Sequence, residues 1–479
     1  MRKVPVLALA IAGAVLLASG CANTRVQNAG AVNELITVRG APAATWPEAS
    51  GGSTREGDAD LLAAKSREPI TLKGAVEIAF LRSPAIRERY AELGISQAEV
   101  IAASEIPNPS FGYASLDADG GATQITRSVS LSFANLLFLP ARMRVANSNL
   151  DGARDRIAAS LLELQGEVEM SWYGYVSAIQ SLQMREAAAR AAEASAEYAR
   201  RLGAAGNLPP RALVLELAES SEARIAAARA KAEVSRTRAE FAALVGLSTR
   251  APWQVAPRLP AVPEKDQAQS ALMNNAADAR LDVLAARREV VALEGGLRLT
   301  RWWRWLGDFE IGYERETETD GMRLSGPTFR LGLPIFNQNR SSVLRAEADL
   351  ERARARLDAL RLAVQNDIAL GLDRLATTLE IAEAYREALV PQREAVTQHT
   401  LEEVNFMLSG AFEALQAKRE QYEAYQEYIE AVRDYWLAHV QLKLAVGGKL
   451  ADDDAVATET IRLEQLAPKA SNDMNGDPK

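Results

Sequence analysis

Leu331-Gly-Leu-Pro-Ile-Phe-Asn-Gln-Asn-Arg340 is the stretch of this 479-residue sequence at which a strand pattern changes to a helix pattern. Before it, residues 308–316 and 322–333 are predicted strands, and Asp320-Gly321 between them is a hairpin signal. After it, residues 341 to about 408 predict one helix of roughly 65 residues, or about 100 Å at 1.5 Å per residue. A short β-hairpin therefore adjoins a very long helix.

The same order of elements occurs twice in the sequence. Phe111-Gly-Tyr113 lies about 200 residues before Ile311-Gly-Tyr313, and Leu244-Val-Gly246 lies at nearly the same distance before Ala445-Val-Gly447. Because the matches include strands and glycines, they indicate an internal duplication rather than a chance likeness of alanine-rich helices. The period is too long for a solenoid repeat, so each copy is half of one larger fold.

Composition and pattern divide the chain into regions. They are a signal peptide (1–20), a tether (21–69), a first repeat (70–247), a proline-rich linker (248–275), a second repeat (276–448) and a polar tail (449–479). The tether is rich in small residues without periodicity, so it is expected to have little structure of its own. The tail is acidic at its start and is expected to be solvated.

Cys21 is the single cysteine and lies at the end of the export signal. Arg2 and Lys3 precede an apolar run, and the small residues before Cys21 resemble the bacterial lipoprotein box, whose cysteine is acylated after cleavage. A buried free thiol, or ordinary signal cleavage nearby, is the alternative. One cysteine cannot form an intramolecular disulfide.

Helical patterns fill both repeats. Thr71 is the expected N-cap of a first helix, and Ser83-Pro84 begins a second that ends near residue 105. The first long helix spans about 142–202, breaks, and returns over 211–245, while the second breaks at 407–410 and returns over 411–444. Coiled-coil packing is predicted by the heptad spacing of Val343, Leu350, Leu357 and Val364.

Each repeat contributes one predicted hairpin, and its strands have about the 9–11 residues that cross an outer membrane. In the first hairpin, Val129 and Leu131 alternate with Ser128 and Ser130, which predicts one apolar and one polar face. A sheet in lipid must close, and single-chain barrels begin at about eight strands. The strands of this chain therefore require an oligomer, unless the hairpins belong to a soluble protein.

An aromatic and basic cluster precedes the third strand. Trp302, Trp303 and Trp305 lie beside Arg301 and Arg304. Such a cluster suits a membrane–water interface, where indole rings sit at the headgroup level. Ordinary core packing is the alternative.

Segments that resemble a known family occur in order along the chain. They are 81–85 (LRSPA), 106–110 (IPNPS), 331–336 (LGLPIF) and 446–448 (VGG), and nearly all of the mature sequence resembles the TolC family of outer membrane efflux proteins. The resemblance implies a mixed but mostly α fold, with long antiparallel coiled-coil helices in a periplasmic tunnel. It also implies that a homotrimer shares one twelve-stranded transmembrane β-barrel. Residues 334–340 are similar to the CzcC-like branch, which serves heavy-metal exporters.

The resemblance implies a function as the outer membrane channel of a tripartite efflux system. The protein would be lipid-anchored in the bacterial outer membrane with a large periplasmic portion. The implied partners are outer membrane lipid, a periplasmic membrane-fusion adaptor and an inner-membrane pump of the RND type. A periplasmic coiled-coil adaptor or scaffold lipoprotein without channel activity is the alternative, and the sequence does not identify the exported molecule.

The periplasmic end is expected where the long helices turn. Adaptor docking is expected at Gly206, Asn207, Ser409 and Gly410. The candidate aperture residues are Glu413, Glu402 and Glu403, although no acid closely follows the first turn. A solvated helix face is the alternative for these glutamates.

Catalysis is not expected. The only histidines, His399 and His439, lie on different predicted helices, and the sequence has neither a metal-ligand Cys/His cluster nor a phosphate loop or nucleophile elbow. We therefore predict no catalytic residue, cofactor or resident metal, and His399 is expected to be a lone surface histidine. The formal net charge of −8 argues against binding of nucleic acid.

Replacement of Cys21 by Ser should abolish lipidation, because the lipoprotein box places the acyl chains on that cysteine. Cells grown with labelled palmitate should label the wild type and not the Cys21→Ser variant. The variant should still assemble, since the lipid adds only an anchor. Equal labelling of the two proteins would refute the assignment.

Overall fold

A computed structural model describes residues 21–46, 68–117, 121, 123–132, 136–263, 280–303, 309–332, 335, 338–448 and 450. The expected signal peptide, Arg304, Trp305 and nearly all of the expected tail lie outside the described residues. The chain divides into two units. Unit 1 comprises the described residues of 1–38, 87–160 and 277–364, and unit 2 those of 39–86, 161–276 and 365–479.

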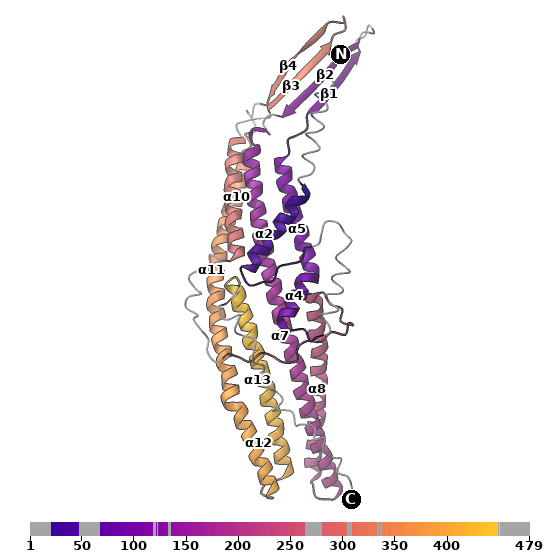
Figure 1. The fold of residues 1–479 in the computed structure, drawn as a ribbon, viewed down its shortest axis with the longest axis vertical. Coiled ribbons are helices and arrows are strands. Elements are labelled where there is room, and N and C mark those ends of the chain that lie inside the picture. Colours follow the sequence, from indigo (N-terminus) through magenta and orange to yellow (C-terminus); the bar gives the residue numbers. More distant parts are fainter. Residues whose placement is uncertain are drawn as a thin grey trace. The chain divides into compact units, whose positions relative to one another are not determined.

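Unit 1 contains a four-stranded antiparallel sheet in the order β1-β2-β3-β4 (Figure 1). The strands are β1 (Ser110–Asp117), β2 (Thr123–Ser132), β3 (Phe309–Thr317) and β4 (Arg323–Leu331). Both predicted hairpins are confirmed, and the second turns at Asp320 and Gly321, where Gly321 has φ +85° and Asp320 accepts a bond from the Met322 amide. Pairing of β2 with β3 joins the two copies, so β1 and β4 are the edges of the sheet.

The register gives the sheet two unlike faces. Val129 lies between Phe111 and Tyr313, and Leu131 lies beside Ile311. We call this side the apolar face; it carries Phe111, Val129, Leu131, Ile311, Tyr313 and Phe329. The other side, the polar face, carries Ser110, Ser128, Ser130, Gly312 and Thr328. The polar face is crowded, because a Cβ at Gly312 would lie 2.7 Å from both Thr328 Oγ1 and the Val129 carbonyl.

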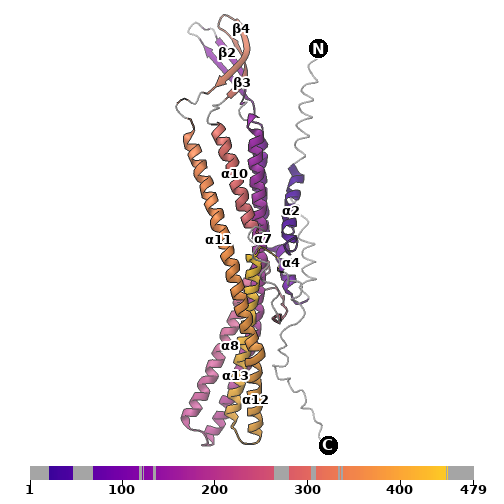
Figure 2. The ribbon, with the colours of Figure 1, turned by 90° about the vertical axis from the view of Figure 1, so that its left-hand side faces the viewer.

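The sequence prediction of an unstructured tether is wrong for its first part. Residues Cys21–Thr37 form helix α2, in which Ala29, Val32 and Ile36 are buried at helical spacing. Asn28 donates to Gln97 Oε1 at 3.1 Å and accepts a bond from Arg154, and Figure 2 shows α2 as a helix of its own. These contacts within unit 1 give the segment tertiary support that its composition does not reveal.

Unit 1 also contains α5 (Pro84–Ser104), the start of α7 (Leu139–Ala204), α10 (Leu281–Trp303) and the start of α11 (Arg340–Ala384). Leu297 of α10 packs with Val343 and Leu350 of α11, two of the predicted heptad residues. Arg301 and Arg354 each form an ion pair between these helices, to Glu347 at 2.6 Å and to Glu294 at 2.7 Å. The predicted heptad seam is confirmed here.

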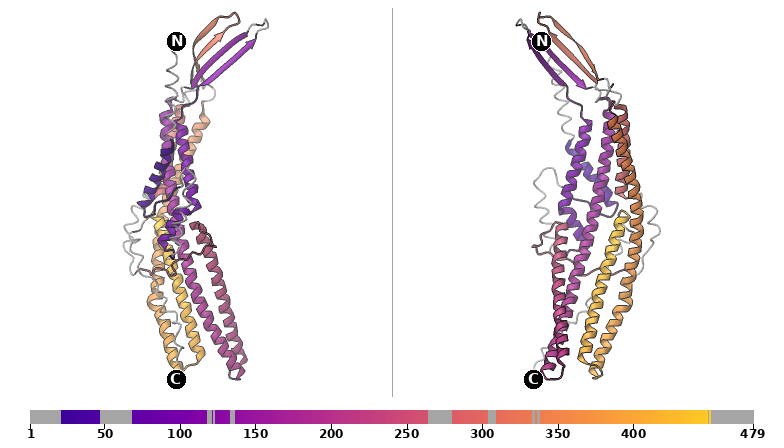
Figure 3. Two further views of the ribbon diagram at one scale, coloured as in Figure 1. Left: turned by 45° about the vertical axis from the view of Figure 1, so that its right-hand side comes forward. Right: turned by 180° about the vertical axis from the view of Figure 1, so that it is seen from behind.

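Unit 2 contains α4 (Leu72–Arg82), the remainder of α7, and α8 (Pro210–Val245). It continues with the end of α11, the π-helical turn η2 (Tyr385–Leu389), α12 (Val390–Asn405) and α13 (Ala411–Ala445). Figure 3 shows α7 with α8, and α12 with α13, as hairpins that turn at the same end. The predicted N-cap of α4 is confirmed, because Thr71 Oγ1 accepts a hydrogen bond from the Gly74 amide at 3.2 Å.

The sequence predicts that the second long helix is one continuous α-helix, and this prediction is wrong. Pro391 lacks an amide proton and clashes with the preceding turn of an α-helix. The chain accommodates it in η2, where the Val390 amide donates to the Tyr385 carbonyl. Arg386 of this turn donates to the Val262 carbonyl at 3.0 Å, so the turn holds the segment that links the repeats.

Aromatic side chains bind the described first part of that linking segment, around Trp253 and Pro260, to the helices of unit 2. Trp253 packs against Tyr175 and Phe241 and lies under the Arg238 guanidinium, 3.9 Å from the ring centroid. Trp436 donates its indole proton to the Pro260 carbonyl at 3.0 Å. Among the helices that the structure describes, none has the length and apolar composition needed to cross a membrane.

The duplication extends to the helix ends. Gly246 after α8 and Gly447 after α13 both have positive φ, +78° and +84°. In both places the next amide reaches back five residues, from Leu247 to Ala242 at 2.8 Å and from Gly448 to Lys443 at 3.0 Å. The two copies therefore end on the same Schellman turn, which requires a residue in the left-handed conformation.

Candidate functional site at the helical tips

The two hairpins of unit 2 close in turns of the same kind. Residues 205–209 join α7 to α8, and residues 406–410 join α12 to α13 (Figures 1 and 3). The Asn207 amide donates to the Leu202 carbonyl at 2.9 Å, and the Leu408 amide donates to the Glu403 carbonyl at 2.9 Å. Each bond belongs to a Schellman C-cap, in which the residue before the donating amide adopts the left-handed conformation.

That left-handed position holds different residues in the two copies. Gly206 adopts it at φ +76°, whereas Met407 adopts it at φ +59°. A side chain with a Cβ costs about 1–2 kcal/mol in this conformation, so the second tip stores strain that the first avoids. Gly410, which the sequence also marks, is instead the N-cap of α13, as Pro209 is of α8.

The second tip exposes three consecutive apolar side chains. Phe406 is 76% exposed, Met407 93% and Leu408 79%. No role was predicted for them from the sequence, although a run of apolar residues in a connection between helices is a signal of function. The first tip differs, because its exposed residues include the small Gly206 and the polar Asn207.

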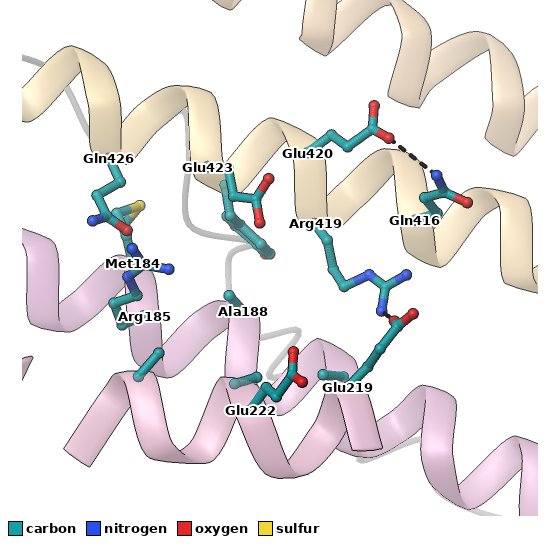
Figure 4. Close-up of a pocket in the computed structure, with 14 residues that line it drawn as sticks. Met184, Arg185, Ala188, Glu219, Glu222, Gln416, Arg419, Glu420, Glu423 and Gln426 are labelled. Atoms are coloured by element: carbon teal, nitrogen blue, oxygen red, sulfur yellow. Dashed lines mark hydrogen bonds and ion pairs between the residues drawn. The ribbon is translucent and has the colours of Figure 1, made fainter. Parts of the chain in front are cut away.

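A cavity of about 510 Å³ lies between the hairpins, lined by α7, α8 and α13 (Figure 4). Figure 4 shows Arg419 reaching from α13 to Glu219 of α8, with which it forms an ion pair. Nearer the tips, Tyr198 of α7 packs on Phe412 of α13 with ring centroids 5.3 Å apart. These contacts hold the first hairpin to the second.

The cavity has more acidic than basic side chains. Its charged lining residues are Glu219, Glu222, Glu420, Glu423, Arg185 and Arg419. On the neighbouring turns of α13, burial lowers the pKa of Lys418, and burial with a bond to Glu394 raises the pKa of Tyr425. The excess of carboxylates among the lining residues favours cations over anions in this cavity.

The candidate aperture glutamates lie at the second tip and have local contacts. Glu413 is exposed in the first turn of α13, and its carboxylate covers Gly410, where an added Cβ would come within 2.5 Å of Oε2. An acid there interacts favourably with the helix N-terminus. Glu402 accepts a bond from Gln398 at 3.2 Å, and Glu403 is exposed on the same turn of α12. Their role in an aperture stays a prediction.

The other candidate residues lie elsewhere in the structure. Cys21 is the first residue of α2, and Trp302 and Trp303 end α10, where Trp302 is 69% exposed. His399 is exposed, while His439 is buried beside Trp436. Within the described ranges, no group of three His, Cys, Asp or Glu residues could hold a metal ion.

Known proteins match most of the chain. Protein CyaE of Bordetella pertussis is 26% identical over 414 residues, which are 81% of this chain and 82% of CyaE. The cobalt-zinc-cadmium resistance protein CzcC of Cupriavidus metallidurans is 22% identical over 330 residues, 68% of this chain and 78% of CzcC. No family model matches the sequence.

The fold also matches solved structures. The CmeC outer membrane channel of Campylobacter jejuni aligns with a TM-score of 0.67 at 12% identity, over 79% of this chain and 85% of CmeC. The chain therefore has the fold of that channel, with its combination of long helices and a small sheet.

Reciprocal substitutions at the two tips should have opposite effects. Met407→Gly removes the strain of a side chain in the left-handed conformation and should stabilise the second tip by about 1 kcal/mol, while Gly206→Ala should destabilise the first by a similar amount. Amide hydrogen exchange of the tip peptides measures this: exchange at Leu408 should slow about fivefold, and exchange at Asn207 should quicken about fivefold. Changes of the same sign at both tips would contradict the assignment.

Proposed function

We propose that this chain, a member of the TolC family of outer membrane efflux proteins, is the outer membrane channel of a tripartite efflux system. The observation that carries the proposal is the open antiparallel sheet, to which each copy of the duplication contributes one β-hairpin. The sheet has one apolar face, and among the described residues no further strand pairs with either of its edges.

A homotrimer closes this sheet. In lipid, the free backbone groups of β1 and β4 need partners, and β4 of a second copy can supply them to β1. Three copies form a barrel of twelve strands, whose apolar face meets lipid and whose small polar residues line the lumen. We also propose that lipid on Cys21 and the exposed Trp302 anchor unit 1, which contains the sheet, to the membrane.

The helical tips are the proposed docking site for a periplasmic membrane-fusion adaptor. The exposed Phe406, Met407 and Leu408 support this, together with the turn residues Gly206, Asn207, Ser409 and Gly410. The adaptor would connect the channel to an inner-membrane pump of the RND type. The similarity to CzcC makes a heavy-metal exporter the first pump to test by co-purification.

A periplasmic scaffold without channel activity is the second candidate, favoured only by the coiled-coil packing. Planar bilayer recordings of the purified protein separate the two, because a scaffold gives no conductance. We propose no enzymatic activity, in keeping with the likeness in fold to an outer membrane channel.

Arg419→Ala should open the channel, because Arg419 and Glu219 join the two hairpins. A partly exposed pair contributes about 1 kcal/mol, so three pairs in a trimer shift the opening equilibrium by about 3 kcal/mol, roughly 100-fold. The control is Arg393→Ala, which removes a pair with Glu420 inside the α12–α13 hairpin and should leave conductance unchanged. Equal conductance of both variants and the wild type in planar bilayers would exclude Arg419 from the gate.

Glu413→Lys should reduce cation selectivity if Glu413 lies in the aperture, because a charge repeated three times in a narrow mouth sets the local field. Trimer assembly should be unaffected, since Glu413 is exposed. Reversal potentials in a salt gradient measure the selectivity. An unchanged value in an assembled trimer would leave Glu413 as a helix N-terminal residue only.

A further inference from the structure

Two arginines face each other across the middle of the sheet. Arg127 of β2 and Arg315 of β3 are partners in the register, so their side chains leave the same face side by side. Each lies two residues from a member of the apolar face, Val129 or Tyr313, and therefore belongs to that face. Both are exposed.

Among the described residues, the charge repulsion between these two arginines is not offset by an acidic side chain beside them on the same face. Like charges directly opposite each other destabilise a sheet. In the described part of the chain, neither guanidinium has a hydrogen bond or an ion pair, whereas Arg330 of the polar face pairs with Glu310 at 3.0 Å. All three glutamates of β3, Glu310, Glu314 and Glu316, lie on the polar face. The arginines thus lack the counter-charge that the other face provides.

Along the strands, the pair lies on the turn side of Val129 and Tyr313. The helices adjoin one end of the sheet, so the hairpin turns lie at its other end (Figure 1). Two residues, or about 7 Å, separate the arginines from Val129 and Tyr313 in the direction of the turns. Tyr113, the register partner of Arg127, lies in the same row, and Arg323 lies on the same face one row further. Tyrosine marks the interfacial girdle of outer membrane barrels.

We propose that Arg127 and Arg315, with Arg323, bind the phosphate groups of the phosphorylated glycolipid in the outer leaflet. The guanidinium fork matches phosphate oxygens and binds them by charge-assisted hydrogen bonds. Arginine on the lipid face is strongly destabilising at the midplane of the bilayer but is tolerated near the interface. An anion between the two guanidinium groups replaces their repulsion with attraction.

The choice of lipid follows from the orientation of the sheet across the membrane. This inference rests on the proposed channel, in which the helices are periplasmic and the hairpin turns reach the cell exterior. The arginines then face the outer leaflet and not the inner one. A homotrimer presents three such sites around the barrel.

Binding of bis-phosphorylated lipid A to the purified full-length trimer, followed by native mass spectrometry, tests the proposal. The Arg127→Gln/Arg315→Gln variant should bind about tenfold more weakly than the wild type. The control, Arg330→Gln, removes an arginine from the polar face and should bind as the wild type does. Equal binding by the double variant would overturn the proposal.

A second arm uses only the wild-type protein and so does not depend on how the variant folds. Dephosphorylated lipid A should bind about tenfold more weakly than the phosphorylated form. Equal binding of the two lipids, or of phosphatidylglycerol and lipid A, would overturn the assignment to outer-leaflet phosphate. Conductance of the same preparations separates the two hypotheses. A conducting trimer that fails both arms would refute the lipid site alone. A wild-type protein without conductance would refute the proposed channel.

Discussion

The free edges of one small sheet constrain the rest of this protein. Strands β1 and β4 each present a row of backbone groups that no other strand in the described part of the chain pairs. An unpaired amide or carbonyl in lipid costs several kcal/mol, so the cost of an open edge exceeds any gain from a single side chain. Pairing of these edges with strands of other copies removes this cost. The apolar face of the sheet and the long helices that adjoin the strands are consistent with that solution.

The duplication supplies a common frame, and the differences between the copies indicate where function lies. Gly246 and Gly447 end their helices in the same way, and Gly206 and Met407 occupy the same position in the two tip turns. The second tip alone combines left-handed strain at a residue other than glycine with an exposed apolar run. A strained and exposed methionine has no value for folding. A partner that covers it provides the physical reason to keep it.

Much of the fold follows from local pattern. Alternation in the strands, the Asp320-Gly321 turn, the Thr71 cap and the heptads each depend on neighbouring residues, and the structure confirms them. The failures come from distant contacts. Helix α2 depends on Asn28 bonding to Gln97 and Arg154, and the pair of Arg419 with Glu219 joins helices far apart in sequence. No periodicity reports such pairs. The helical spacing of the buried Ala29, Val32 and Ile36 was a readable signal that the small-residue composition concealed.

The magnitudes at the tips favour opening by a partner over opening by thermal motion alone. The ion pairs between the hairpins of a trimer hold them with about 3 kcal/mol, if each contributes about 1 kcal/mol. Full burial of one large apolar side chain contributes about 1.5–3 kcal/mol, and the second tip exposes Phe406, Met407 and Leu408. Docking of the proposed adaptor on these side chains would therefore release enough free energy to separate the hairpins. A ligand shifts an equilibrium only by the difference in its affinity for the two states, so the proposed adaptor would have to contact these side chains better when the hairpins are apart.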